Sequence, residues 1–244
     1  MTIWPGMTAG MEAVSKALRQ NGYVDQETNI EKRDSLKLIQ SALEEAHFNE
    51  DITSSAIFKK NDTARAVLLC KQDGILCGID IFEEVFRIVD KGLKISSFKR
   101  DKDPVSRGDI VSEIHGRTTS ILKAERVALN FISMLSGIAT KSHKISEILT
   151  PFKIKPLDTR KTIPGFRKLS KYAVFVGGSI NHRLCLSDMG LIKDNHIAAA
   201  GGVANSIRML RQKYPHKKCE VEVENIPQLQ EALPERPDMV LLDN

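Results

Sequence analysis

The chain has 244 residues and a formal net charge of +5, and 41% of its residues are hydrophobic. This composition excludes collagen-like and disordered classes, and its apolar runs fall far short of the roughly 20 residues that a membrane-spanning helix needs. The first 20 residues lack the basic and then apolar pattern of a secretory signal, and the four cysteines form no C-x-x-C pair. We therefore expect a cytoplasmic protein with reduced thiols and no membrane partner.

The charges are sorted along the chain. Residues 158–196 contain seven basic and three acidic residues, whereas residues 219–244 contain seven acidic residues and one arginine. Only 5% of the residues are aromatic, and no nucleic-acid-binding module is recognisable. The basic segment is thus better suited to small anionic ligands than to a nucleic acid.

The first half of the chain mixes helical and extended patterns and is α+β in character. Apolar spacing predicts a helix around Leu36–Ala46, a short buried strand at Arg65–Cys70, a helix at Ile79–Val89 and a strand at Ile110–Ile114. A long helical pattern follows over Ile121–Leu149, with Gly137 as its expected break, so that a pair of core helices is predicted. We place a domain boundary before this pattern, dividing the chain into residues 1–117 and 118–244.

The second half alternates between short extended and helical patterns, which is typical of parallel strands joined by right-handed crossovers. The expected strands are Lys153–Leu157, Met189–Lys193, Cys219–Val223 and Met239–Leu242, and the expected helices are Phe166–Tyr172, Val203–Tyr214 and Pro227–Leu233.

Charged clusters follow each of these four predicted strands. They begin at Asp158, Lys193, Glu222 and Asp243. In closed parallel barrels the functional residues lie on the loops after the strand carboxyl ends. The pattern therefore predicts one shared site.

Cationic residues of this segment suit carboxylates and phosphates: Arg160, Lys161, His182, Arg183 and Lys193. We expect them to be unpaired until an anion binds. The acids Glu222 and Asp243 can hold Mg²⁺ on a diphosphate or stabilise positive charge on a sugar carbon. The simpler alternatives are that each cation is a surface residue, that His182 is a core histidine, and that Glu220, Glu222 and Glu224 form the wet face of an edge strand.

Several strings, in order along the chain, closely resemble the nicotinate-nucleotide pyrophosphorylase family, also called quinolinate phosphoribosyltransferases. They are Glu125-Arg126-Val127-Ala128-Leu129-Asn130-Phe131, Leu135-Ser136-Gly137-Ile138-Ala139-Thr140, Asp158-Thr159-Arg160-Lys161-Thr162-Ile163-Pro164-Gly165, Gly177-Gly178-Ser179-Ile180-Asn181-His182-Arg183 and Leu191-Ile192-Lys193-Asp194-Asn195-His196-Ile197.

The resemblance implies an α/β protein with an N-terminal α/β sandwich domain and an incomplete, truncated α/β barrel, paired as a homodimer. It implies that quinolinate and phosphoribosyl pyrophosphate, with Mg²⁺, give nicotinate mononucleotide, pyrophosphate and CO₂ in NAD biosynthesis. Arg126 would reach the quinolinate of the partner subunit. Substrate binding would further involve Thr159, Arg160, Lys161, His182, Arg183 and Lys193, catalysis Lys161, Lys193, Glu222 and Asp243, and metal binding Glu222 and Asp243.

Two departures from the family pattern define the alternatives. Ser179 and Cys185 stand where family members often have glycine, and the chain stops at Asn244, before the glycine-rich phosphate loops of the family. We therefore expect a truncated form with weakened donor binding. One alternative is an inactive remnant that dimerises with an intact partner and regulates it, and another is a related barrel transferase with a different substrate.

Overall fold

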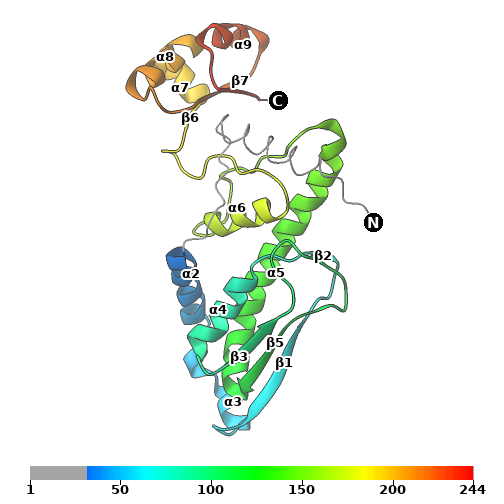
Figure 1. Cartoon of the computed structure of the whole chain (residues 1–244). Helices are drawn as coiled ribbons and strands as arrows, with labels where there is room; N and C mark the ends of the chain where they lie inside the picture. The colour runs from blue at the N-terminus through cyan, green and yellow to red at the C-terminus, as the bar shows by residue number, and fades with distance from the viewer. Residues whose placement is uncertain (1–31, 244) are drawn as a thin grey trace. The chain divides into compact units, whose positions relative to one another are not determined.

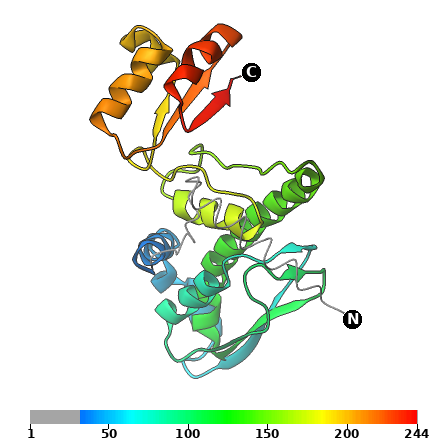
Figure 2. The ribbon, with the colours of Figure 1, turned by 45° about the horizontal axis from the view of Figure 1, so that its top comes forward.

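A computed structural model describes residues 32–243, with side chains from Ser35 onward. The described residues group into two compact units that divide between His182 and Arg183. We call their described parts, residues 32–182 and 183–243, the N-terminal unit and the C-terminal unit, and we describe each by itself (Figures 1 and 2). The prediction about a secretory signal lies outside the described residues.

The N-terminal unit combines helices with short antiparallel strands (Figure 1). Its elements are α2 (Lys32–Glu45), η1 (Phe48–Glu50), α3 (Ile52–Ile57), β1 (Thr63–Leu69), β2 (Gly74–Ile75), α4 (Ile79–Val89), β3 (Lys94–Ser97), β4 (Pro104–Val105), β5 (Ile110–Arg117), α5 (Thr118–Leu149), η2 (Thr150–Phe152) and α6 (Arg167–Val176). The predicted helices near residues 36–46 and 79–89 and the predicted strand near residues 110–114 are confirmed. The short elements α3, β2, β3 and β4 were not predicted.

The predicted strand at Arg65–Cys70 forms as β1, but its interpretation as a buried strand is wrong. β1 is an edge strand of the antiparallel sheet β1-β5-β3, and its residues alternate between half-buried and exposed. Val67 and Leu69 are 42% and 41% exposed, whereas Ala66 and Leu68 pack against the hydrophobic core. Only one face of the sheet is covered by helices, so only alternate side chains of β1 reach the core.

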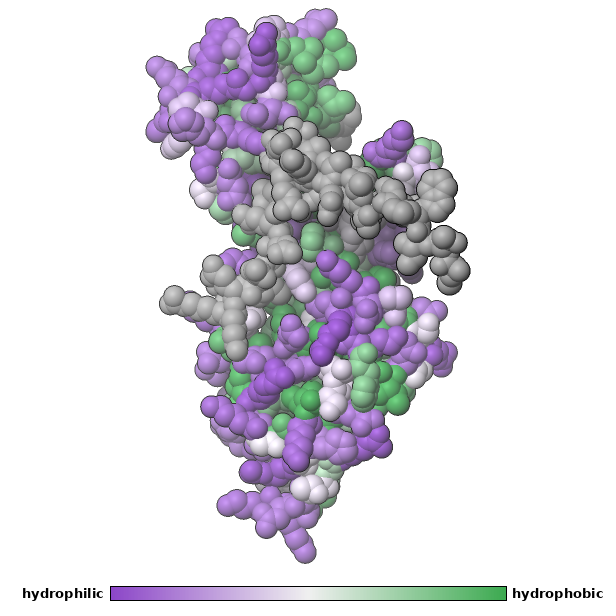
Figure 3. Space-filling view, viewed as in Figure 1, coloured by the Kyte–Doolittle hydropathy of each residue, from purple (hydrophilic) through white to green (hydrophobic). Residues whose placement is uncertain are grey.

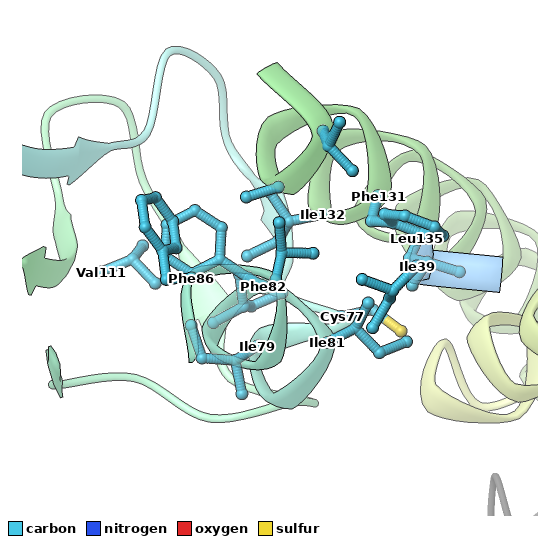
Figure 4. Packing of buried hydrophobic residues seen from close by; sticks show 14 of the residues in the cluster. Ile39, Cys77, Ile79, Ile81, Phe82, Phe86, Val111, Phe131, Ile132 and Leu135 are labelled. Carbon is cyan, nitrogen blue, oxygen red and sulfur yellow. The ribbon is translucent and has the colours of Figure 1, made fainter. Parts of the chain in front are cut away.

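The long helix α5 is the central element of the hydrophobic core. Phe82 and Phe86 of α4 lie beside Ile132 of α5, and their rings meet edge to face with centroids 5.0 Å apart (Figure 4). The predicted break at Gly137 is wrong, because α5 continues as one helix of 32 residues. Gly137 is exposed on this helix, so the surrounding turns keep their hydrogen bonds and the glycine costs only its intrinsic propensity, about 1 kcal/mol.

The helix α6 packs closely against α5. A Cβ atom on Gly177, directly after α6, would lie 2.3 Å from the carbonyl oxygen of Ala139, so the glycine permits this approach. The predicted strand Lys153–Leu157 is wrong, because its only ladder contact is a single bridge between Leu157 and Ile180. Lys153 ends η2 with a left-handed φ of 57°, and Ile154 is 54% exposed, so the segment has neither the conformation nor the burial of a core strand.

The C-terminal unit contains the parallel sheet β6-β7-β8 with helices between the strands (Figure 2). Its elements are β6 (Gly190–Ile192), α7 (Asp194–Ala200), α8 (Val203–Lys213), β7 (Cys219–Val223), α9 (Ile226–Ala232), η3 (Leu233–Glu235) and β8 (Met239–Leu242). The predicted alternation is confirmed, with the strands within one or two residues of their expected bounds. Helix α7 is not among the predicted helices, and it forms directly after β6.

The chain divides differently by packing and by prediction. In the structure, the chain passes from one compact unit to the other between His182 and Arg183. The domain boundary between residues 117 and 118 stays a prediction. No described helix is long and apolar enough to span a membrane.

Candidate functional site

Two loops of the N-terminal unit carry predicted binding residues, and Asp158 joins them. One loop holds Thr159, Arg160 and Lys161, and the other ends at His182. The Oδ1 atom of Asp158 accepts a hydrogen bond of 2.8 Å from the backbone N–H of His182. The backbone N–H of Asp158 in turn donates to the carbonyl oxygen of Ile180 at 3.1 Å. The structure therefore brings the Arg160 loop and His182 together, as predicted.

The side chain of Arg160 has an unsatisfied donor. Its Nε atom is buried and has no hydrogen-bond partner in the part of the chain that the structure describes. A buried donor without an acceptor costs roughly 1–3 kcal/mol, which an anionic ligand would recover. The neighbouring Lys161 is exposed, and its backbone N–H donates to the Oγ1 atom of Thr159 at 3.1 Å, which turns the loop. This arrangement suits the binding of a carboxylate or phosphate.

Arg126 lies on an exposed part of α5 and borders two grooves. The larger groove has a volume of about 1060 Å³ and is walled by β1, β2 and one face of α5. The smaller, of about 410 Å³, includes Ile163 and Phe166 from the segment that follows Lys161. Arg126 is therefore far from Arg160 in the sequence. In space, however, it borders the same groove as Ile163 and Phe166, which follow Arg160 closely along the chain.

Ser179, the first of the two departures from the family pattern, is accommodated without strain. It is 6% exposed, and its Oγ atom lies 2.7 Å from the Oγ of Ser142 and 2.8 Å from the Oγ of Ser146. Both partners belong to α5, so the three hydroxyl groups satisfy one another. The side chain of Ser179 fits here because α5 provides small polar side chains around it.

Three predicted site residues of the C-terminal unit lie at the carboxyl ends of its strands. The Nζ atom of Lys193, after β6, lies 2.8 Å from the Oε2 of Glu222 on β7. Asp243 follows β8, and its backbone N–H donates to the carbonyl oxygen of Val223 at 3.0 Å. These three strand ends therefore lie side by side in one parallel sheet, whereas a shared site that also includes the Asp158 cluster stays a prediction. The expectation of an unpaired Lys193 is wrong, because Glu222 lies within reach of its flexible side chain.

The alternative in which the acids of β7 form the wet face of an edge strand is also wrong. β7 is the central strand of the three, and Glu220 is 3% exposed. The side chain of Glu222 is 14% exposed, which is far below the exposure of a solvated surface glutamate. Glu222 is thus held between two neighbouring strands.

The loop before β6 holds Arg183 and Cys185. Arg183 is 7% exposed, and its Nη1 atom donates to the carbonyl oxygen of Met189 at 3.1 Å. Asp188 accepts hydrogen bonds from the backbone N–H groups of Leu184 and Cys185 at 2.7 and 3.0 Å, and its other oxygen lies 2.9 Å from the Cys185 sulfur. The cysteine side chain is therefore accommodated within this turn.

The described residues contain no group of three acidic, histidine or cysteine side chains that could hold a metal ion. Glu222 and Asp243 supply two carboxylates at adjacent strand ends. Mg²⁺ is commonly bound by one or two protein carboxylates together with phosphate oxygens of the substrate and water. The two acids therefore fit a magnesium ion that arrives with a diphosphate.

Sequence reasoning missed two residues that support the site, Lys171 and Asn181. Lys171 is 1% exposed and donates to the Oδ1 of Asp158, and the Nδ2 of Asn181 donates to the Oδ2 of the same carboxylate at 2.8 Å. The apolar residues Leu169, Ala173 and Val176 of α6 follow helical spacing. Lys171 stands two residues after Leu169 and therefore does not belong to this apolar pattern. No signal in the sequence therefore marks it as buried.

The fold and the site define a mixed α/β protein with a barrel-type C-terminal domain and a set of cationic loops suited to small anions. Comparison with family models assigns the chain to a particular family. The N-terminal domain of quinolinate phosphoribosyl transferase matches residues 51–136, and the C-terminal domain matches residues 138–244. The chain belongs to the quinolinate phosphoribosyl transferase family.

Relatives and solved structures agree with this family. The chain is 41% identical over 195 residues to a probable nicotinate-nucleotide pyrophosphorylase (carboxylating) of Bacillus subtilis, with 80% of this chain and 67% of that protein covered. It is 39% identical over 194 residues to a chloroplastic relative of Arabidopsis thaliana, with 78% and 55% covered. The nicotinate-nucleotide pyrophosphorylase structure from Francisella tularensis superposes with a TM-score of 0.85 at 38% identity, covering 90% of this chain and 78% of that one.

Proposed function

We propose that the protein transfers the phosphoribosyl group of phosphoribosyl pyrophosphate to quinolinate and releases CO₂, which gives nicotinate mononucleotide and pyrophosphate. The observation that carries the proposal is the buried Nε donor of Arg160, in a loop that Asp158 ties to His182. Both loops carry cationic or imidazole groups, and quinolinate brings two carboxylates. The names of the relatives supply the reaction class that these groups would serve.

Each unit would contribute a different part of the chemistry. In the N-terminal unit, Arg160, Lys161 and His182 would bind the carboxylates and orient the pyridine nitrogen. In the C-terminal unit, Glu222 and Asp243 would stabilise the positive charge that develops on the ribose carbon as pyrophosphate leaves. The new bond places a positive charge on the pyridine nitrogen, which stabilises the carbanion formed when the adjacent carboxylate departs as CO₂. That carbanion then takes a proton.

Magnesium is part of the proposal. Glu222 and Asp243 would hold it, and the ion would neutralise charge on the leaving diphosphate. Since Lys193 lies 2.8 Å from Glu222, the lysine side chain would have to share or release this carboxylate when the donor binds. The variant Asp243→Asn tests this assignment, and we expect it to weaken selectively the dependence of activity on Mg²⁺.

A second copy of this chain is the proposed partner. Arg126 is exposed at the border of the 1060 Å³ groove, and the groove contains the apolar residues Val67, Leu69 and Ile110, which are 41–44% exposed. In the view of Figure 3, apolar patches lie among polar residues on the surface of the N-terminal unit. Burial of this surface against a second copy would remove apolar area from water. It would also let Arg126 serve the partner's substrate.

The reaction is tested with purified protein, quinolinate labelled at the 2-carboxylate, phosphoribosyl pyrophosphate and Mg²⁺. The expected result is release of labelled CO₂ together with nicotinate mononucleotide, both lost in Arg160→Ala. Turnover of nicotinate at the same rate would contradict the preference for a dicarboxylate, because the arginine set would then leave a buried charge unpaired. No release by a folded protein would contradict the proposal and favour an inactive, dimerising form.

The dimer is tested by mixing two inactive variants, Arg126→Ala and Arg160→Ala. If Arg126 serves the partner's site, random exchange of subunits restores about a quarter of the sites, because a mixed dimer carries one intact site. Two samples of the same variant, mixed in the same way, are the control. A mixture that exchanges subunits and stays inactive would show that both arginines act within one chain.

A further inference from the structure

The carboxylate of Asp158 accepts hydrogen bonds on both of its oxygens inside the N-terminal unit. Its Oδ1 receives the ammonium group of Lys171 and the backbone N–H of His182, the latter at 2.8 Å. Its Oδ2 receives the Nδ2 of Asn181, also at 2.8 Å. The side chains of Asp158 and Lys171 are only 7% and 2% exposed, so this is a buried ion pair.

Lys171 also makes a second contact with the same loop. Its Nζ atom donates to the carbonyl oxygen of His182 at 2.8 Å, and its own carbonyl oxygen accepts from the Nδ2 of Asn181 at 2.8 Å. The backbone of His182 is therefore held at both its N–H and its C=O. One ammonium group on the rigid helix α6 thus connects the loop that begins at Asp158 with the loop that ends at His182.

We propose that Lys171 is a positioning residue, which sets the distance between Arg160 and His182 through Asp158 and thereby determines how tightly the protein holds a dicarboxylate. The inference rests on the proposed function. A merely structural pair would stabilise the fold without affecting the ligand. Loss of a positioning pair weakens ligand binding by more than the accompanying loss of fold stability would. The reason is that the two carboxylates of the ligand must meet donors on both loops at once.

A neighbouring residue provides a matched control. Tyr172 also lies on α6, and its hydroxyl donates to the Oδ2 of Asp101 at 2.7 Å. Asp101 accepts from the backbone N–H groups of Gly78 and Ile79 at the start of α4, far along the chain from both loops. Tyr172→Phe therefore removes a partly buried hydrogen bond of α6 without touching the link between the Arg160 and His182 loops.

The test uses the full chain and three variants: Lys171→Met, the double variant Asp158→Asn with Lys171→Met, and Tyr172→Phe. Thermal unfolding and quinolinate binding by calorimetry are measured for each, with steady-state KM values for both substrates. Lys171→Met is expected to raise the Kd for quinolinate about ten-fold or more, with little change in the KM for phosphoribosyl pyrophosphate. Tyr172→Phe is expected to lower the unfolding temperature but to keep the Kd within about two-fold of the wild type.

The double variant separates stability from positioning. It leaves no buried charge without a partner, so it should recover unfolding temperature relative to Lys171→Met while quinolinate binding stays weak. A folded double variant with wild-type affinity would overturn the inference, as would equal losses of affinity in Lys171→Met and Tyr172→Phe. A double variant that does not fold would also overturn it, because the pair would then be essential to the fold itself. A wild-type protein that binds no quinolinate would instead refute the proposed function, and the inference with it.

Discussion

The two units hold their functional charges in different ways. In the N-terminal unit the ion pair of Asp158 and Lys171 is almost fully buried, and backbone groups of the His182 loop complete it. In the C-terminal unit the side chain of Lys193 is 46% exposed and reaches Glu222 at a strand end. The cores differ as well, with 25 buried residues in the main cluster of the N-terminal unit and seven in the cluster of the C-terminal unit.

The difference indicates which charges support the fold and which are available for chemistry. A buried pair is expensive to break, because the remaining charge stays in a medium of low dielectric. A pair whose lysine is half exposed contributes little to stability, since water weakens the attraction between its two charges. Removing one partner of the buried pair should therefore cost stability as well as function, whereas removing Lys193 should cost function with little loss of stability.

The largest expected effect is on the buried pair. Asp158→Ala leaves the ammonium of Lys171 unpaired and should lower the free energy of unfolding by about 3–5 kcal/mol. Urea unfolding monitored by circular dichroism measures it. Arg65→Met is the control, because Arg65 is 58% exposed in its pair with Glu113 and its loss should cost much less stability. Similar losses in the two variants would contradict the distinction between buried and exposed charges.

Lys193→Met tests the opposite case. We expect its free energy of unfolding to stay within about 1 kcal/mol of the wild type, while quinolinate turnover falls about a hundred-fold or more. Urea unfolding and initial rates on the same preparation give both quantities. A variant with normal turnover would remove Lys193 from the proposed catalytic residues, and a variant with a large loss of stability would show that the exposed pair supports the fold.

The two cores are compared through their buried cysteines, Cys77 in the N-terminal unit and Cys219 in the C-terminal unit. Burial raises the pKa of both thiols, that of Cys219 to about 11, so reaction with a thiol reagent at neutral pH requires local opening. We expect Cys219 to react faster than Cys77, because fewer buried contacts must separate. Labelling followed by peptide mass spectrometry measures both rates, and the reverse order would contradict this ranking of the two cores.

The smallest expected effect concerns the exposed Gly137 of α5. Gly137→Ala should raise the free energy of unfolding by roughly 0.5–1 kcal/mol, because alanine loses less backbone entropy in a helix and no described atom lies within 4 Å of its added Cβ. Thermal and urea unfolding measure the gain. A loss of stability would contradict the view that this exposed position of α5 accommodates the added methyl group.

The accuracy of the sequence-based predictions varies from element to element for physical reasons. Strand β7 and helix α4 have their predicted bounds, because their apolar spacing agrees with their burial. Strand β8 also has its predicted bounds, although Leu241 and Leu242 are exposed. The segment Lys153–Leu157 is apolar enough for a strand but makes only one bridge, since strand formation depends on a neighbour that sequence spacing does not reveal. The predicted helix break at Gly137 is wrong for a similar reason. The helix α5 is kept continuous by packing against other elements, which the sequence around Gly137 does not reveal.

The sequence by itself determined the family and the alternation of strands and helices in the C-terminal unit, because motifs and hydrophobic periodicity are local properties. Only the tertiary structure decided that Lys171 is buried, that its ammonium joins two loops through Asp158, and that Glu222 is held on a central strand beside Lys193. These facts depend on contacts between residues far apart in the chain, and the cost of burying a charge is determined by what surrounds it after folding.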